Sequence, residues 1–220
     1  MTLKFYFHPL SSFCHKALIA LYECGAPFEP MIVNLHETES RAAFLKIWPA
    51  GKFPVLRDEA AGRTIPESSI IIEYLAQHYP GSSRLVYADP DLARQTRLRD
   101  RFFDFFVHLP MQKIIGDRLR PEGQRDPYGV EEARRQIRAA YDMLEDAIRD
   151  GDMAGRTWAM GEEFTLADCA AGPALFYANM AEPFGQGHGR VKAYLERLMK
   201  RPSYARVLKE AEPYFAMIPK

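Results

Sequence analysis

Two serines and a cysteine stand close together near the start of the chain, where an apolar run gives way to a helical pattern. The run LKFYF occupies residues 3–7, and Ser11, Ser12 and Cys14 follow after a short turn. A helix N-terminus offers unpaired backbone N–H groups and about half a positive charge, which lower the pKa of a thiol resting there. Ser11 and Ser12 are therefore candidates to activate a bound thiol by hydrogen bonding. The alternative is that they only cap the helix.

A second polar segment precedes a strand pattern. Lys52, Phe53 and Pro54 follow a Pro-Ala-Gly turn. If Pro54 is cis, the backbone N–H and C=O ahead of it are free to pair with a bound peptide. The alternative is an ordinary trans proline at an edge strand. Lys52 is either the partner of a carboxylate or a solvated surface lysine.

A third polar segment begins the next helical pattern. Ser68 and the first N–H groups of that helix could bind a carboxylate, and Glu67 could accept from an ammonium group. The alternative is a simple N-terminal cap with a favourably placed charge.

The elements that position these groups follow from periodicity and turn residues. A helix from Ser12, its expected N-cap, ends at Gly25. Pro30 places the second strand at a sheet edge or at least interrupts its ladder of hydrogen bonds. The full order is a strand over 3–7, a helix over 12–24, a strand over 28–35, a helix over 41–47, a hairpin over 54–57 and 63–65, and a helix over 67–78. This order predicts a four-stranded α/β domain of the thioredoxin kind.

The rest of the chain has helical spacing only. Residues 81–91 are rich in turn formers and predict a linker between a domain over 1–80 and a second domain over 92–220. Helices are expected over 92–110, 131–149, 166–179 and 191–200, so the second domain is an all-α helical bundle. Thr165 and Asp168 have capping-box spacing.

Composition excludes several classes of protein. Twenty-nine basic residues balance twenty-nine acidic ones, so no global charge attracts nucleic acid or an anionic membrane. No apolar run is long enough to span a bilayer, and the first residues lack a signal-peptide core. Three cysteines without a C-x-x-C pair favour neither disulfides nor a zinc site, and no metal is expected. We therefore expect a cytoplasmic protein.

Four segments together resemble the glutathione transferase superfamily. They are FYFHPLSSFCHKALIAL, PAGKFPVL, IPESSIIIEYL and FTLADCAAGPALFY, in this order along nearly the whole chain. The spacing of Ser11 and Cys14 is similar to bacterial serine-type, theta-like or zeta-like members. The resemblance implies a thioredoxin-like domain followed by a helical domain, usually in a homodimer, with detoxification as the usual role.

The resemblance also implies roles for the candidate residues. Ser11, or Ser12 beside it, would donate to the sulfur of glutathione, which is a co-substrate. Phe53, ahead of a cis Pro54, would pair with the cysteinyl part of glutathione. The remaining contacts would come from Lys52 at the glycine carboxylate and from Glu67 and Ser68 at the γ-glutamyl end.

The second substrate, a small hydrophobic electrophile, should lie between the domains. The segment LRDRFFDFFVHL over 98–109 offers one wall, and Phe106 and Met111 are weak candidates to line it. Part of this aromatic set is expected to be bundle core. Cys14 is expected to pack as a small buried hydrophobe, and His15 to be exposed.

Several activities fit the same site. The leading expectation is a glutathione transferase that acts on apolar electrophiles. The alternatives are a glutathione-dependent isomerase, an ether-cleaving enzyme, a dehalogenase, or a non-catalytic binding scaffold. The scaffold gains weight if Phe13 or Trp48 blocks the Ser11 turn.

Overall fold

The first part of the chain folds around a four-stranded sheet. The computed structural model describes residues 3–81 and 83–219. The strand order is β2-β1-β3-β4, with β1 parallel to β2 and antiparallel to β3, and with β3 and β4 forming a hairpin. The strands are β1 (Leu3–Phe7), β2 (Phe28–Ile32), β3 (Val55–Asp58) and β4 (Arg63–Pro66). The predicted thioredoxin-like arrangement is confirmed, and β2, which contains Pro30, lies at the sheet edge as expected.

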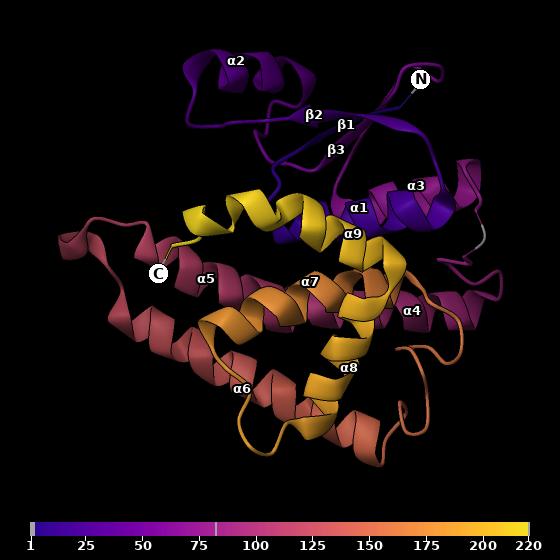
Figure 1. Ribbon diagram of the computed structural model, residues 1–220, viewed down its shortest axis with the longest axis vertical. Coiled ribbons are helices and arrows are strands. Elements are labelled where there is room, and N and C mark those ends of the chain that lie inside the picture. Colours follow the sequence, from indigo (N-terminus) through magenta and orange to yellow (C-terminus); the bar gives the residue numbers. More distant parts are fainter. Residues whose placement is uncertain (1–2, 82, 220) are drawn as a thin grey trace.

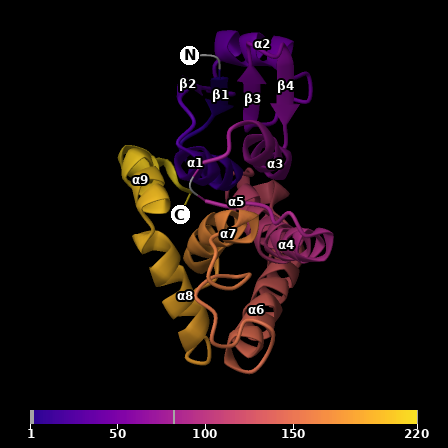
Figure 2. The same cartoon turned by 90° about the vertical axis from the view of Figure 1, so that its right-hand side faces the viewer.

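Helices cover both faces of this sheet. Helix α2 (Thr38–Ile47) lies on one face, while α1 (Ser12–Cys24) and α3 (Ser68–His78) lie on the other (Figures 1 and 2). Helix α1 ends at Gly25, whose φ of 62° is the left-handed conformation predicted for it. The predicted N-cap was wrong by one residue. Ser11 is the cap, and Ser12 is the first helical residue.

The second part of the chain is helical, as predicted. Below α1 and α3 in Figure 2, helix α7 is surrounded by the other long helices. The elements are α4 (Pro90–Phe102), a π-helical segment η1 (Phe103–His108), α5 (Leu109–Arg118), a short η2 (Glu122–Gln124), α6 (Pro127–Arg149), α7 (Leu166–Ala181), α8 (Gly189–Lys200), α9 (Pro202–Ala211) and a final 3-10 segment η3 (Glu212–Met217). Within the described ranges, no helix is both long and apolar enough to cross a membrane.

One hydrophobic core runs through both domains. It joins side chains of β1, α1 and α3 to those of α5, α6, α7, α8 and α9. Helix α1 is enclosed because it contacts α3 of its own domain and also α7 and α9 of the helical domain. The expected exposure of His15 is therefore wrong. Its side chain is fully buried, and its ring lies beside those of Tyr177 and Tyr204, with centroids 5.5 and 6.4 Å away.

Candidate functional site

One cavity of about 670 Å³ gathers residues from three separate turns of the sheet domain. The predicted residues among its lining are Ser11, Lys52, Phe53, Pro54, Glu67 and Ser68. Ser12 is not among them. It lines a second cavity, which Ser11 lines as well. The opposite wall of the first cavity comes from the helical domain through α4, η1 and α5.

Ser11 caps α1 in a way that leaves its proton free. Its Oγ accepts a hydrogen bond from the backbone N–H of Cys14 at 3.3 Å. This contact uses a lone pair of the hydroxyl, so the O–H can still donate to a ligand. Capping the helix and activating a thiol are therefore compatible roles for the same side chain. The cap also holds the hydroxyl at the positive end of α1.

The peptide bond between Phe53 and Pro54 is cis, which rules out the trans alternative. Pro54 is buried directly before β3, and Phe53 is half-buried and lines both cavities. The Phe53 ring stacks on His8, with the centroids 5.9 Å apart. Trp48 packs against Phe44 and Val55 and lines neither cavity.

Glu67 has a backbone conformation that residues with side chains rarely adopt. Its φ is 68°, the only positive value among the described residues other than glycine. Such a conformation costs of order 1–3 kcal/mol and persists where the surroundings enforce it, often at functional sites. Here Glu67 immediately precedes α3, and its carbonyl accepts from the N–H of Ile71 at 2.9 Å. Its side chain is exposed in the cavity lining beside the buried Ser68.

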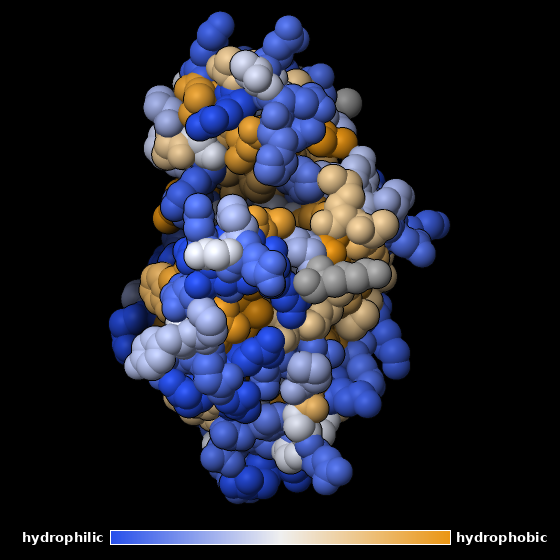
Figure 3. Space-filling view, turned by 90° about the vertical axis from the view of Figure 1, so that its left-hand side faces the viewer, coloured by the Kyte–Doolittle hydropathy of each residue, from blue (hydrophilic) through white to orange (hydrophobic). Residues whose placement is uncertain are grey.

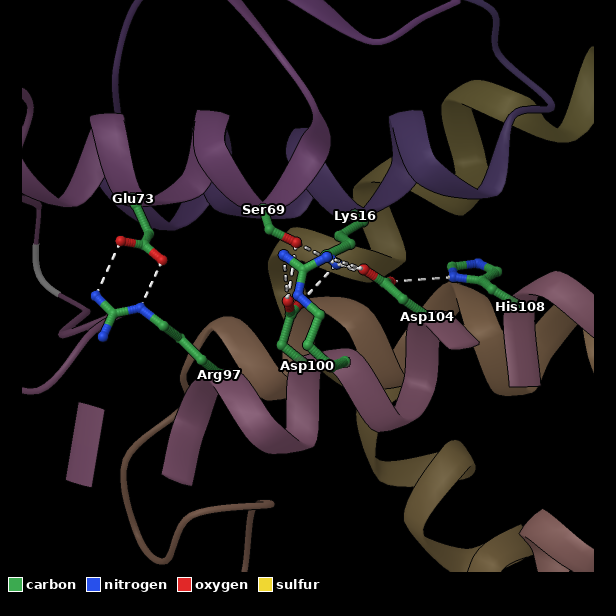
Figure 4. Close-up of polar contacts among 8 residues, drawn as sticks. Lys16, Ser69, Glu73, Arg97, Asp100, Asp104 and His108 are labelled. Atoms are coloured by element: carbon green, nitrogen blue, oxygen red, sulfur yellow. Dashed lines mark hydrogen bonds and ion pairs between the residues drawn. The ribbon is translucent and has the colours of Figure 1, made fainter. Parts of the chain in front are cut away.

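A buried ion cluster includes Ser69 in the first turn of α3 (Figure 4). Lys16 of α1 is fully buried, and its Nζ lies 2.6 Å from Asp100 and 2.8 Å from Asp104. Ser69, the neighbour of Ser68, accepts from Lys16 at 2.9 Å and donates to Asp100 at 2.8 Å. The first turn of α3 is thus tied to both α1 and the helical domain.

The same cluster reaches the cavity surface. Ser69, Arg101 and Asp104 all line the first cavity, and Arg101 lies 3.3 Å from Asp100 and 3.5 Å from Asp104. Burial lowers the pKa of His108, 3.6 Å from Asp104, and this histidine is therefore neutral near pH 7. Sequence analysis missed this cluster. The sequence feature that could have indicated the cluster is Lys16, a charged residue within the apolar pattern of α1.

The second cavity, of about 630 Å³, is more apolar and meets the first at the Ser11 turn. The two cavities share Ser11, Phe53 and Gln112. Met111, a weak candidate, lines the second cavity, as do residues of the C-terminal segment. The other weak candidate, Phe106, is 55% exposed and lines neither cavity. Hydrophobic residues are visible where the two parts of the molecule meet in Figure 3.

The cysteines are not placed for nucleophilic chemistry. Cys14 is fully buried, as predicted, and burial raises the pKa of its thiol to about 12. Burial also raises the pKa of Cys169, which is fully buried on α7. In residues 3–81 and 83–219, no group of three or more His, Cys, Asp or Glu side chains is arranged to hold a metal ion.

Comparisons with known families give two matches. Residues 5–83 match the family described as the glutathione S-transferase N-terminal domain. Residues 127–197 match the glutathione S-transferase C-terminal domain. The first match contains the Ser11 turn, the cis proline and the start of α3, and the second contains the capping box of α7.

Similar proteins span most of this chain. A glutathione S-transferase of Pseudomonas putida is 27% identical over 96% of this chain and 93% of its own length. A glutathione S-transferase-like protein, LUC7, of a Fusarium species is 33% identical over 70% of this chain, which spans 65% of that protein. Among solved structures, a glutathione S-transferase of Methylobacterium radiotolerans in complex with glutathione sulfonate has a TM-score of 0.78 and 26% identity, with 93% of each chain covered.

Proposed function

Because the chain belongs to the glutathione S-transferase superfamily, we propose that it is a serine-type glutathione transferase that acts on small apolar electrophiles. The main support for this proposal is the lining of the first cavity. Residues from three turns meet there, namely Ser11, Lys52, Phe53, Pro54, Glu67 and Ser68. These groups match the functional groups of glutathione, which are a thiol, a peptide backbone, two carboxylates and an ammonium.

Each contact follows from the chemistry of the ligand. Ser11 donates its free proton to the sulfur, while the N-terminus of α1 stabilises the thiolate. The backbone of Phe53 pairs with the cysteinyl residue, and Lys52 meets the glycine carboxylate. The γ-glutamyl carboxylate lies at Ser68 and the first turn of α3, and Glu67 accepts from the ammonium group.

The reaction takes place where the two cavities meet. The thiolate sulfur attacks the electrophilic carbon of an acceptor held in the second cavity. A C–S bond forms, and in a substitution the leaving group departs with the electron pair of the broken bond. The protein lowers the barrier by holding both reactants in one geometry and by keeping the sulfur ionised.

The role of Ser11 is tested by the pKa of the bound thiol. Thiolate absorbance is titrated with glutathione bound to the wild type, Ser11→Ala and Ser12→Ala. A hydrogen bond to a charged group contributes about 1.5–3 kcal/mol, so Ser11→Ala should raise the thiol pKa by about 1–2 units. Ser12→Ala should leave it near the wild-type value. An unchanged thiol pKa in Ser11→Ala contradicts the proposed role.

Mass balance separates the proposed reaction from its alternatives. A transferase consumes one glutathione for each conjugate formed. An isomerase returns glutathione unchanged, and ether cleavage or dehalogenation releases a phenol or a halide from an otherwise unactivated substrate. A non-catalytic scaffold turns over none of these acceptors, and that result would contradict the proposal.

A further inference from the structure

The second cavity is lined by one permanently charged side chain among the described residues. This side chain is Arg118, at the end of α5. The described lining contains no aspartate or glutamate. His8 also lines the cavity, but burial, together with the charge of His36, lowers its pKa, so it is neutral near pH 7. The apolar cavity therefore carries a positive charge at one place.

That charge is not neutralised by the part of the chain that the structure describes. Arg118 donates from Nη1 to the carbonyl of Pro219 at 3.1 Å, which uses one of its five N–H donors. The adjacent carboxylate is engaged elsewhere, since Asp117 accepts from the backbone N–H of Asp126 at 2.8 Å and lies 3.6 Å from Arg120. Among the described residues, no carboxylate lies within ion-pair distance of Arg118.

A half-buried guanidinium in an apolar cavity is a recognition group for a carboxylate. Its planar donors match the two carboxylate oxygens, and the contact is stronger than in water because the surroundings are apolar. We propose that the second cavity selects apolar electrophiles that carry a carboxylate, with Arg118 as the residue that binds it. This inference rests on the proposed function, and it names the substrate class of that same site.

The size of the cavity sets the shape of such an acceptor. About 630 Å³ lies within the range of small-molecule sites and accommodates an aromatic ring with its substituents. The reacting carbon would face Ser11, where the cavities meet, and the carboxylate would point away from it towards Arg118. Arg118 therefore acts in binding and orientation and has no part in bond formation.

A matched pair of acceptors tests the proposal. The acid is 4-chloro-3,5-dinitrobenzoate, and the neutral partner is its carboxamide. In both, glutathione thiolate forms the C–S bond and chloride leaves with the electron pair. The two acceptors differ in intrinsic reactivity. For each acceptor, kcat/KM of a variant is therefore divided by kcat/KM of the wild type, and these ratios are compared between the acceptors.

Two substitutions of Arg118 and one control complete the design. Arg118→Gln removes the charge but keeps a donor for Pro219, while Arg118→Lys keeps the charge and loses the planar fork. Arg125→Gln is the control, because Arg125 is an exposed arginine that lines neither cavity. Thermal unfolding confirms that each variant is folded.

The expected result is selective. Arg118→Gln lowers kcat/KM for the acid about tenfold or more, as expected for losing about 1.4 kcal/mol of binding, and changes that for the carboxamide less than twofold. Arg118→Lys loses less than Arg118→Gln, and Arg125→Gln changes neither.

Equal losses for the two acceptors, or no loss for either, overturn the inference. If the wild type converts the carboxamide but not the acid, the inference about Arg118 is overturned and the proposed function stands. A wild type that converts neither acceptor contradicts the proposed function, and the inference falls with it.

Discussion

At the scale of single residues, the buried charges of α1 make testable contributions to stability. Near the end of the helix, Glu23 is held by Arg201 through two hydrogen bonds of 2.8 Å, by Ser203 at 2.5 Å and by Ser83. Burial alone would raise the pKa of Glu23, but these hydrogen bonds lower it overall. The group therefore stabilises the fold above its unfolded pKa of about 4.3, and this contribution is lost as the pH falls through the folded value.

We predict that Glu23→Gln flattens the acid side of the stability profile. The unfolding free energy of the wild type should fall between about pH 5 and pH 3, and the variant should lose part of this slope. At pH 7 the variant should be about 2 kcal/mol less stable, because charged hydrogen bonds are lost. Urea unfolding at several pH values measures both effects. Glu196→Gln, at an exposed position on α8, is the control. A wild-type slope in Glu23→Gln would contradict the assignment.

Lys16 lies at the centre of the ion cluster, and its loss should be costly. Lys16→Met removes the fully buried cation that Asp100 and Asp104 share, although the exposed Arg101 stays within 3.5 Å of both. Breaking a buried ion pair on one side typically costs about 3–5 kcal/mol, and we predict a loss in this range from urea unfolding at pH 7. Lys46→Met, at an exposed position on α2, should change the unfolding free energy by less than about 0.5 kcal/mol. A loss of less than 1 kcal/mol in Lys16→Met would be incompatible with a close buried ion pair.

At the scale of elements, local signals predicted the sheet domain well. Turn-forming residues separate the strands and helices there, such as Gly25 after α1 and the Pro-Ala-Gly turn before β3. The predicted boundaries of these elements therefore fall within a few residues of the observed ones. The N-cap was placed at Ser12 rather than Ser11 because the two neighbouring serines are equivalent in a sequence pattern. Only the φ and ψ of Ser11 and its bond from Cys14 distinguish them.

The π-helical segment η1 was not predictable from periodicity. Phe103 and Val107 are buried while Phe105 and Phe106 are more than half exposed, so the segment shows aromatic residues on more than one face. A pattern of this kind fits an α-helix equally well. In the structure the segment places Asp104 against Lys16, a contact between residues 88 positions apart. That contact depends on tertiary packing rather than on local sequence.

The capping box of α7 was predicted from spacing and is confirmed, and it should be a strong determinant of stability. Asp168 is fully buried and accepts from the N–H groups of Thr165 and Ala159 and from the hydroxyl of Tyr194. Asp168→Ala leaves these donors without their acceptor. We predict that the unfolding free energy, measured by urea unfolding, falls by about 3 kcal/mol or more. Asp89→Ala removes the exposed cap of α4 and should cost only about 1 kcal/mol. Similar losses in the two variants would contradict this account.

At the scale of the whole molecule, the candidate site divides into a predictable half and an unpredictable half. The first half comes from turns of the sheet domain, where residue type and local context indicated Ser11, Lys52 and Glu67. The second half comes from the packing of the helical domain. Arg118 and the C-terminal segment meet across 101 positions, and no local pattern encodes such a contact. The sequence therefore predicted more residues of the proposed glutathione cavity than of the acceptor cavity.

The continuous core leads us to predict that the two domains unfold together. The chain has two tryptophans, Trp48 in the sheet domain and Trp158 in the helical domain. Trp48→Phe and Trp158→Phe each leave one reporter, so fluorescence follows each domain separately. Because α1 and α3 bury side chains in the core that α7 shares, unfolding of the helical domain should remove the support of the sheet domain. In each variant, urea unfolding followed by fluorescence and by far-ultraviolet circular dichroism should give the same midpoint. A Trp48 transition at clearly lower urea than the circular dichroism transition would show that the sheet domain unfolds independently.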